Sequence, residues 1–456
     1  MIRMTLMAAS SLVLAGCATF SADGGMTQVS SLTQDRTGHP VSYQRSQQDA
    51  DEARSRVAEL LKAPLTADGA VELALLNNRG LQAQLGELGV SEADLVQAGR
   101  LRNPVVELGR LAGGGALEID RSVMFDVLGL LTLPARSQIA QRRFETAQLQ
   151  AASDAVAAAS EVRQAFFEAI AAQQLADYAR QVMDAAEASN DLARGMVRAG
   201  NLSKLDQMRE QAFYAGATAQ LARSRQQAVA ARERLVRALG LGDAHASLQL
   251  PERLPDLPME AAEGQDAERA ALDKRLDVLI AKRDAEATAR QLGLTRVTGF
   301  VDVLDLGWQN KSERGSPQER GGKVQFDLPL FDFGGAVRAR SQAEYMQALN
   351  RTAAVAVNAR SEVREAYAGY RTAYDLARHY RDEVVPLHKR ISDENMLRYN
   401  GMLIDVFQLL ADARERVASV TASVEASRDY WLAESRLQAA LAGASAASGR
   451  SPTSNP

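Results

Sequence analysis

The feature that most constrains this chain is a long helical stretch that occurs twice. No proline lies between Pro134 and Gly200 and no glycine before Gly195, while apolar residues recur there at helical spacing. These apolar positions are Val156, Ala159, Val162, Phe166, Ala169, Ile170, Leu175 and Val182. A helix of about sixty residues is roughly 90 Å long at 1.5 Å per residue. Because such a rod cannot fold inside a compact globule, we expect an elongated protein.

The second half of the chain repeats the first at an offset of 201 residues. The matches are EVRQAF at 161–166 with EVREAY at 362–367, FD at 125–126 with FD at 326–327, and Gly200 with Gly401. Three matches in one register indicate an internal duplication. The 53 basic and 57 acidic residues give a net charge of −4, so nucleic acid is not an expected partner.

The N-terminus is typical of a lipidated secreted protein. Residues 1–16 form an apolar signal peptide too short to span a bilayer. The only cysteine, Cys17, ends the sequence LAGC, which resembles a bacterial lipobox, and Ala18 behind it favours the outer membrane by resemblance to known lipoproteins. The alternative is an ordinary signal peptide with an incidental cysteine. No later apolar run reaches 18 residues, so we expect strands to make any membrane crossing.

The chain divides into a tether, two repeats and a tail. Residues 17–64 predict a lipidated tether with a short helix from about 49 to 62. The first repeat covers 65–242, a linker 243–259 and the second repeat 260–442. Residues 443–456, rich in Ser, Gly and Pro, are expected to be disordered.

Each repeat predicts a helix, a β-hairpin and a long helical hairpin. In the first, a helix runs from Thr66 to about Gly99, strands cover 105–111 and 117–127, and long helices cover Pro134 to 198 and 202–239. In the strand 117–127 apolar and polar residues alternate, and Arg121 interrupts the apolar face. A soluble hairpin is the alternative interpretation.

The second repeat follows the same plan. It predicts a helix to about 292, strands at 297–308 and 324–330 joined by a polar turn at 309–322, and helices at 335–399 and 403–441. Pro386 lies inside the long helix and is expected to kink it or to cost roughly 3 kcal/mol.

Four strands cannot close a barrel, and open sheet edges leave backbone groups unsatisfied in lipid. Other copies of the chain must therefore complete the wall. The predicted fold is mainly α with a membrane β-barrel, in a ring-shaped oligomer whose long helices pack side by side.

The chain resembles the TolC-like outer-membrane efflux proteins over nearly its whole mature length. The matching residues are Leu65-Thr66, Ala70-Val71, Leu73-Ala74-Leu75, Asn78, Leu81, Asn103-Pro104, 326–332, Gly334, Val385-Pro386-Leu387 and Tyr399-Asn400-Gly401. This resemblance implies a homotrimer with a 12-stranded barrel in the outer membrane and an α-helical tunnel across the periplasm. It also implies docking on a periplasmic adaptor and an inner-membrane pump.

The resemblance directs the search for a site to the tips of the long helical hairpins. Asp206 and Asp405 are candidates for an acidic ring at the periplasmic aperture, against the alternative of solvated charges at helix ends. Candidate adaptor contacts are Gly200, Asn201, Leu202, Gly401, Met402 and Leu403, for which simple turn chemistry is the alternative.

No catalytic or metal-binding motif accompanies these residues. The four histidines are scattered, and neither a GxSxG nor an HExxH sequence occurs, so we expect no enzyme activity and no cofactor. The sequence predicts a passive exit duct of a tripartite efflux system, in the outer membrane and anchored at Cys17. The alternatives are a periplasmic coiled-coil adaptor lipoprotein and a structural lipoprotein that never inserts. The cargo is not indicated.

Overall fold

The computed structural model describes residues 19–113, 116–242, 248–261, 273–299, 303–313 and 315–444. The signal peptide, Cys17 and most of the predicted tail lie outside these residues. The chain forms two compact units, and four of the boundaries between them fall within helices: α2 (Met26–Thr37), α5 (Arg79–Ala98), α6 (Val127–Arg198) and α10 (Gly335–His379). Unit 1 comprises Met1–Val29, Gln84–Ala151 and Leu276–Val357, and unit 2 comprises Ser30–Ala83, Ala152–Arg275 and Asn358–Pro456.

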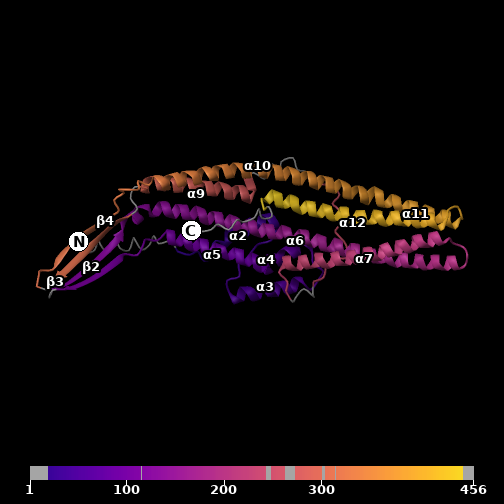
Figure 1. Cartoon of the computed structure of the whole chain (residues 1–456), viewed down its shortest axis with the longest axis horizontal. Helices are drawn as coiled ribbons and strands as arrows, with labels where there is room; N and C mark the ends of the chain where they lie inside the picture. Colours follow the sequence, from indigo (N-terminus) through magenta and orange to yellow (C-terminus); the bar gives the residue numbers. More distant parts are fainter. Residues whose placement is uncertain are drawn as a thin grey trace. The chain divides into compact units, whose positions relative to one another are not determined.

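Unit 1 contains an antiparallel sheet with the strand order β1-β2-β3-β4 (Figure 1). The strands are β1 (Val105–Gly113), β2 (Ala116–Asp126), β3 (Leu304–Glu313) and β4 (Glu319–Phe326). The prediction of the first hairpin is confirmed, but that of the second is wrong in its boundaries. Helix α9 (Leu276–Thr298) includes the predicted start of β3, and the polar residues 309–313 continue that strand. The predicted turn is wrong for these residues, because four of the five pair with polar residues of β2 and so extend the sheet.

Helix α6 (Val127–Arg198) begins directly after β2, seven residues before its predicted start at Pro134. Asp126 caps it, because its Oδ1 accepts a hydrogen bond from the Gly129 amide at 2.5 Å. Pro134 therefore lies within the helix rather than in its first turn. The carboxylate cap was a stronger start signal than the proline. Helix α7 (Lys204–Leu239) returns from α6.

The N-terminal helices differ from the prediction in two places. Besides α3 (Gln47–Leu60), the predicted tether contains a second helix, α2 (Met26–Thr37). The helix predicted from Thr66 to Gly99 is two helices, α4 (Ala67–Asn77) and α5 (Arg79–Ala98). Asn78 separates them: its backbone is extended, and its Oδ1 accepts a hydrogen bond from the Leu81 amide, which caps α5.

The second long helix is interrupted, as Pro386 suggested. Helix α10 (Gly335–His379) continues as a π-helical segment, η2 (Tyr380–Val384), and then as α11 (Val385–Asn400), followed by α12 (Val406–Ala442). Pro386 stands in the first turn of α11, where its missing amide hydrogen is not required. The interruption thus takes the form of one wide turn.

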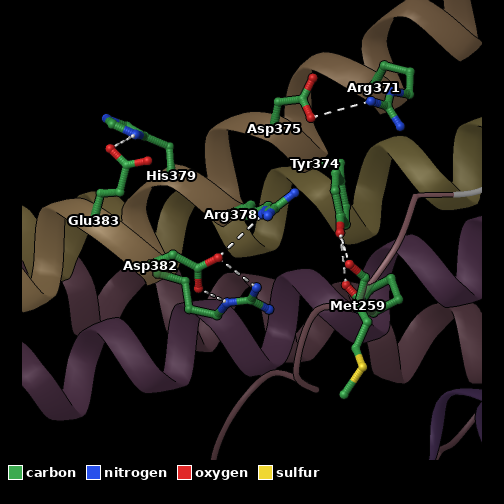
Figure 2. Close-up of polar contacts among 10 residues, drawn as sticks. Met259, Arg371, Tyr374, Asp375, Arg378, His379, Asp382 and Glu383 are labelled. Atoms are coloured by element: carbon green, nitrogen blue, oxygen red, sulfur yellow. Dashed lines mark hydrogen bonds and ion pairs between the residues drawn. The ribbon is translucent and has the colours of Figure 1, made fainter.

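Several ion pairs lie on the helix around this interruption (Figure 2). Arg378 and Arg381 both bind Asp382, and His379 lies 3.2 Å from Glu383. The hydrogen bond from Arg381, with a further one from Arg378, lowers the pKa of Asp382 below its ordinary value. The Tyr374 hydroxyl points the other way and donates to the carbonyl oxygen of Met259, 2.7 Å away, which fastens the linker between the repeats.

The core of unit 2 joins the two repeats through aromatic side chains. Phe167 of α6 stacks on Trp431 of α12 with a centroid distance of 5.0 Å, and Tyr430 contacts both Tyr370 and Tyr374. Among the described helices, none combines the length and the apolar character that a membrane-spanning helix requires.

Candidate functional site

The sheet of unit 1 has two chemically different faces. Residues that pair directly across antiparallel strands share a face, so the register assigns every side chain. One face, called the polar face, carries seven carboxylates and two lysines: Glu107, Glu118, Asp120, Asp126, Asp305, Glu313, Glu319, Lys311 and Lys323. The formal charge on this face is thus negative.

Charges on the polar face are paired with one another across the strands. Glu107 accepts hydrogen bonds from the Lys323 ammonium at 2.9 Å and from the Ser122 hydroxyl at 3.0 Å. Lys311 lies 2.6 Å from Glu118. These contacts link β1, β2, β3 and β4 and hold the strands in register. They leave an excess of carboxylates on the same surface.

The opposite face, called the apolar face, exposes large apolar side chains to solvent. They are Val106, Leu108, Phe125, Leu306, Trp308, Val324 and Phe326. The predicted alternation of apolar and polar faces is confirmed, including its interruption at Arg121. A contiguous apolar surface of this kind is uncommon on soluble monomers and marks a protein or membrane contact.

Both edges of the sheet are open within the part of the chain that the structure describes. Strand β1 pairs only with β2, and β4 pairs only with β3. The outer backbone groups of these two strands are therefore available to a further strand. An open edge beside an exposed apolar face is a site for association with other chains.

The first helical tip, between α6 and α7, ends in a glycine turn. Gly200 adopts a left-handed backbone with φ of +77°, and the Asn201 amide donates to the Met196 carbonyl at 2.9 Å. Ser203 then caps α7, because its Oγ accepts a hydrogen bond from the Asp206 amide at 3.1 Å.

The second tip, between α11 and α12, repeats this turn with an offset of 202 rather than 201. Its left-handed residue is Met402, with φ of +57°, whereas Gly401 has a φ of −82°. The Leu403 amide donates to the Arg398 carbonyl at 2.8 Å. The sequence match of Gly200 with Gly401 is therefore not a structural equivalence.

Because the offset at the tips is 202, Asp206 and Asp405 do not occupy equivalent positions in the two turns. Asp405 caps α12 by accepting a hydrogen bond from the Gln408 amide at 2.8 Å, so its equivalent is Ser203 rather than Asp206. Asp206 accepts a hydrogen bond from the Ser203 hydroxyl at 2.6 Å and lies 3.0 Å from Arg209. Both carboxylates thus have local partners at the starts of their helices.

The six predicted contact residues lie at these two tips. Met402 and Leu403 expose most of their side chains, and Asn201 and Gly401 are also exposed, whereas Leu202 is half-buried. Met402 is the only non-glycine residue with positive φ among the described residues. An exposed residue that is held in a strained conformation is a candidate for a functional contact.

A buried ion pair near the tips was missing from the predictions. Glu210 of α7 is 2% exposed and binds Arg414 of α12 at 2.7 Å, while the Ser189 hydroxyl of α6 donates to it at 2.9 Å. The Arg414 guanidinium also lies over the Phe213 ring. These contacts join the hairpins of the two repeats. Charged residues on a helix are usually solvated, so nothing in the local sequence distinguished them.

No group of three or more His, Cys, Asp or Glu residues with metal-binding geometry occurs in the described ranges. The seven carboxylates of the polar face are instead spread along four strands. Such an arrangement creates an electrostatic surface rather than a coordination site.

No model of a protein family matches the chain. The chain is 28% identical over 282 residues to the cobalt-zinc-cadmium resistance protein CzcC of Cupriavidus metallidurans. That match covers 59% of this chain and spans 64% of the length of the relative.

Two solved structures show the likeness of fold. A membrane protein from Pseudomonas aeruginosa superposes with a TM-score of 0.71 at 20% identity, covering 82% of this chain and 93% of that one. The outer-membrane channel OprN superposes with a TM-score of 0.69 at 19% identity, covering 88% and 94%. The chain therefore shares the fold of outer-membrane channels.

Proposed function

We propose that this chain, which has the fold of the TolC-like outer-membrane channels, is the exit duct of a tripartite efflux system. In this proposal it conducts substrates passively and carries out no chemical step. An inner-membrane pump supplies the energy, and a periplasmic adaptor connects the two.

The two-faced, open-edged sheet is the observation that carries the proposal. In lipid, backbone groups at an open edge cost several kcal/mol each, so β1 and β4 must find partners. Three copies supply twelve strands and close a barrel when β4 of one copy pairs with β1 of the next. The apolar face then contacts lipid and the polar face lines the lumen.

We propose that the helical hairpins of the three copies pack side by side into a periplasmic tunnel. We propose that their tips meet the adaptor through Gly200, Asn201, Leu202, Gly401, Met402 and Leu403. The exposed side chains of Met402 and Leu403 support this assignment. Asp206 and Asp405 are proposed to line the aperture, where three copies of each build a negative potential.

We further propose that the cargo is cationic. The polar face carries seven carboxylates against two lysines, and an acidic lining favours cations over anions. The matched relative is named for resistance to cobalt, zinc and cadmium, which supports divalent metal cations as a cargo class.

The N-terminus fits the same location. We propose that Cys17 is lipidated and anchors each copy in the outer membrane, with the helices in the periplasm. Both alternatives, a periplasmic adaptor and a structural lipoprotein, leave the exposed apolar face without an occupant.

Reconstitution in planar bilayers tests the proposal. We expect stable channels with cation selectivity, measured by the reversal potential in a salt gradient. A preparation that stays monomeric, lacks a heat-modifiable oligomer and never conducts would overturn the proposed duct.

A double variant tests the aperture. Asp206→Ala removes a carboxylate that is not the N-cap of its helix. Asp405→Asn replaces the other carboxylate by an amide, whose oxygen can still cap α12. We expect weaker block by divalent cations and lower cation selectivity. The matched control is Asp191→Ala, which removes one exposed carboxylate from α6 away from the turns. An unchanged block in the double variant would remove these residues from the aperture.

A further inference from the structure

The apolar face of the sheet contains three arginines that the duct itself does not require. Arg121 lies in the row Leu108, Arg121, Asn310 and Arg320, and Arg110 lies in the next row beside Ile119. All three arginines are exposed. Among the paired strand residues, this face carries no carboxylate. Positive charge is therefore concentrated at one level of a face that otherwise suits lipid.

The arginines contrast with the lysines on the polar face. Lys311 and Lys323 each bind a glutamate. Among the described residues, the Arg320 guanidinium contacts the neutral Gln318 amide oxygen at 3.1 Å, and neither Arg110 nor Arg121 forms an ion pair or a side-chain hydrogen bond. Arg110 lies diagonally from Arg121 on the neighbouring strand, and Arg320 lies two strands from Arg121, across Asn310. Guanidinium groups this near one another, without a counter-charge on the same face, repel one another unless an anion occupies the space beside them.

The position of the three arginines along the strands is consistent with the position of a membrane surface. The β1–β2 and β3–β4 connections lie beyond the arginines, whereas the strand ends that lead into α6 and α10 carry Phe125 and Phe326. Exposed apolar side chains continue past that end to Leu330 and Phe331.

The strand itself spans part of the apolar height of a membrane. Arg320 and Phe326 of β4 are six residues apart, which is roughly 20 Å of extended strand. At a tilt near 40° this covers about 15 Å across the membrane, compared with an apolar height of roughly 25 Å for an outer-membrane barrel. The exposed apolar residues of the loop after β4 continue from Phe326 on the side away from the arginines.

We propose that Arg110, Arg121 and Arg320 bind the phosphate groups of outer-leaflet glycolipid around the barrel. The proposal rests on the proposed function, which places the connections of the hairpins outside the cell. Guanidinium groups bind phosphate through paired, charge-assisted hydrogen bonds, and their long side chains reach from an apolar surface to the headgroups. The three arginines thus fix the depth of the sheet in the membrane.

Lipid binding by the purified oligomer tests this inference. Wild-type protein in neutral detergent is titrated with fluorescent bisphosphorylated lipid A and with its dephosphorylated form. We expect a preference for the phosphorylated lipid of roughly tenfold or more, the effect of one charge-assisted hydrogen bond. The triple variant Arg110→Gln, Arg121→Gln and Arg320→Gln should lose this preference. The triple lysine variant, which keeps the charge, should retain part of it.

A matched control removes three exposed arginines elsewhere. Arg54→Gln, Arg340→Gln and Arg398→Gln change the net charge equally and break only exposed helical ion pairs. This variant should keep the preference. Inorganic phosphate is added as a competitor, because its displacement of lipid A at low millimolar concentration would indicate a free-anion site and overturn the assignment.

The outcomes separate this inference from the proposed function. A triple glutamine variant that conducts normally and still prefers phosphorylated lipid A shows that the arginines do not bind it. Wild-type protein that conducts but does not discriminate between the lipids also overturns only the inference. Failure of wild-type protein to form channels overturns the duct, and the lipid site with it.

Discussion

The two repeats leave the sheet in different ways. After β2 the chain enters α6 without an intervening residue, and Asp126 caps the helix. After β4, residues 327–334 separate the strand from α10, and this segment exposes Leu328, Leu330, Phe331 and Phe333. Duplicated sequence thus produced one direct exit and one that passes through an apolar loop.

The comparison shows that the same backbone requirement can be met by different residues. The direct exit depends on a carboxylate that accepts a hydrogen bond from one of the first amides of the helix, that of Gly129. The loop exit depends on Gly334, which has a φ of +71° and faces the backbone of Gly299. A similar exchange occurs at the tips, where Gly200 in one repeat and Met402 in the other provide the left-handed turn.

Of the substitutions that test this comparison, the replacement of Gly334 should lower the stability of the protein most. A Cβ atom at position 334 would lie 1.9 Å from the Gly299 carbonyl oxygen, and the positive φ disfavours any side chain. We expect Gly334→Ala to lower the free energy of unfolding by about 3 kcal/mol or more, measured by chemical denaturation of the full-length protein in detergent. Gly335→Ala is the control, since a Cβ there meets nothing within 4 Å. Equal effects of the two changes would show that the loop exit is not built on Gly334.

Removing the carboxylate should weaken the direct exit by a smaller amount. Asp126→Ala leaves the Gly129 amide without its acceptor, and the expected loss is about 1 kcal/mol. Asp126→Asn keeps an acceptor oxygen and should cost less than half as much. Hydrogen exchange of the first turn of α6 measures both. Faster exchange in the asparagine variant than in the alanine variant would contradict the capping role.

The smallest expected difference in stability is between alanine substitutions at the glycines of the two helical tips. Gly200→Ala places a side chain in the left-handed region and should cost about 1 kcal/mol, whereas Gly401→Ala should change stability by less than about 0.5 kcal/mol because its φ is −82°. Thermal unfolding of the two variants, compared side by side, measures the difference. If Gly401→Ala proved the more damaging change, the offset of 202 at the tips would be wrong.

Much of the fold followed from patterns along the chain. The duplication, the first hairpin, its two faces and the interruption at Pro386 are local or periodic features, and the structure has each of them. Element boundaries were less accurate where two start signals competed. Asp126 and Pro134 are both good helix starts, and the choice depended on where β2 stops pairing.

In the candidate site, as in the fold, local features were predicted and contacts between distant residues were not. The sequence placed Asp206, Asp405 and the six contact residues at the tips, because turns and caps are encoded within a few residues. Their roles at an aperture and an adaptor remain predictions. The Glu210–Arg414 pair could not be predicted, since its partners are 204 residues apart and ordinary in their local surroundings.

The sequence by itself determined which residues alternate in the strand 117–127 and therefore that this strand has a polar and an apolar side. Only the tertiary structure decided which strands pair and in which register, because pairing depends on contacts between residues far apart in the chain. That register combined scattered charges into an acidic face and brought three arginines into two adjacent rows of the opposite face. Periodicity fixes the direction of a side chain, whereas its neighbours across a sheet are fixed by the fold.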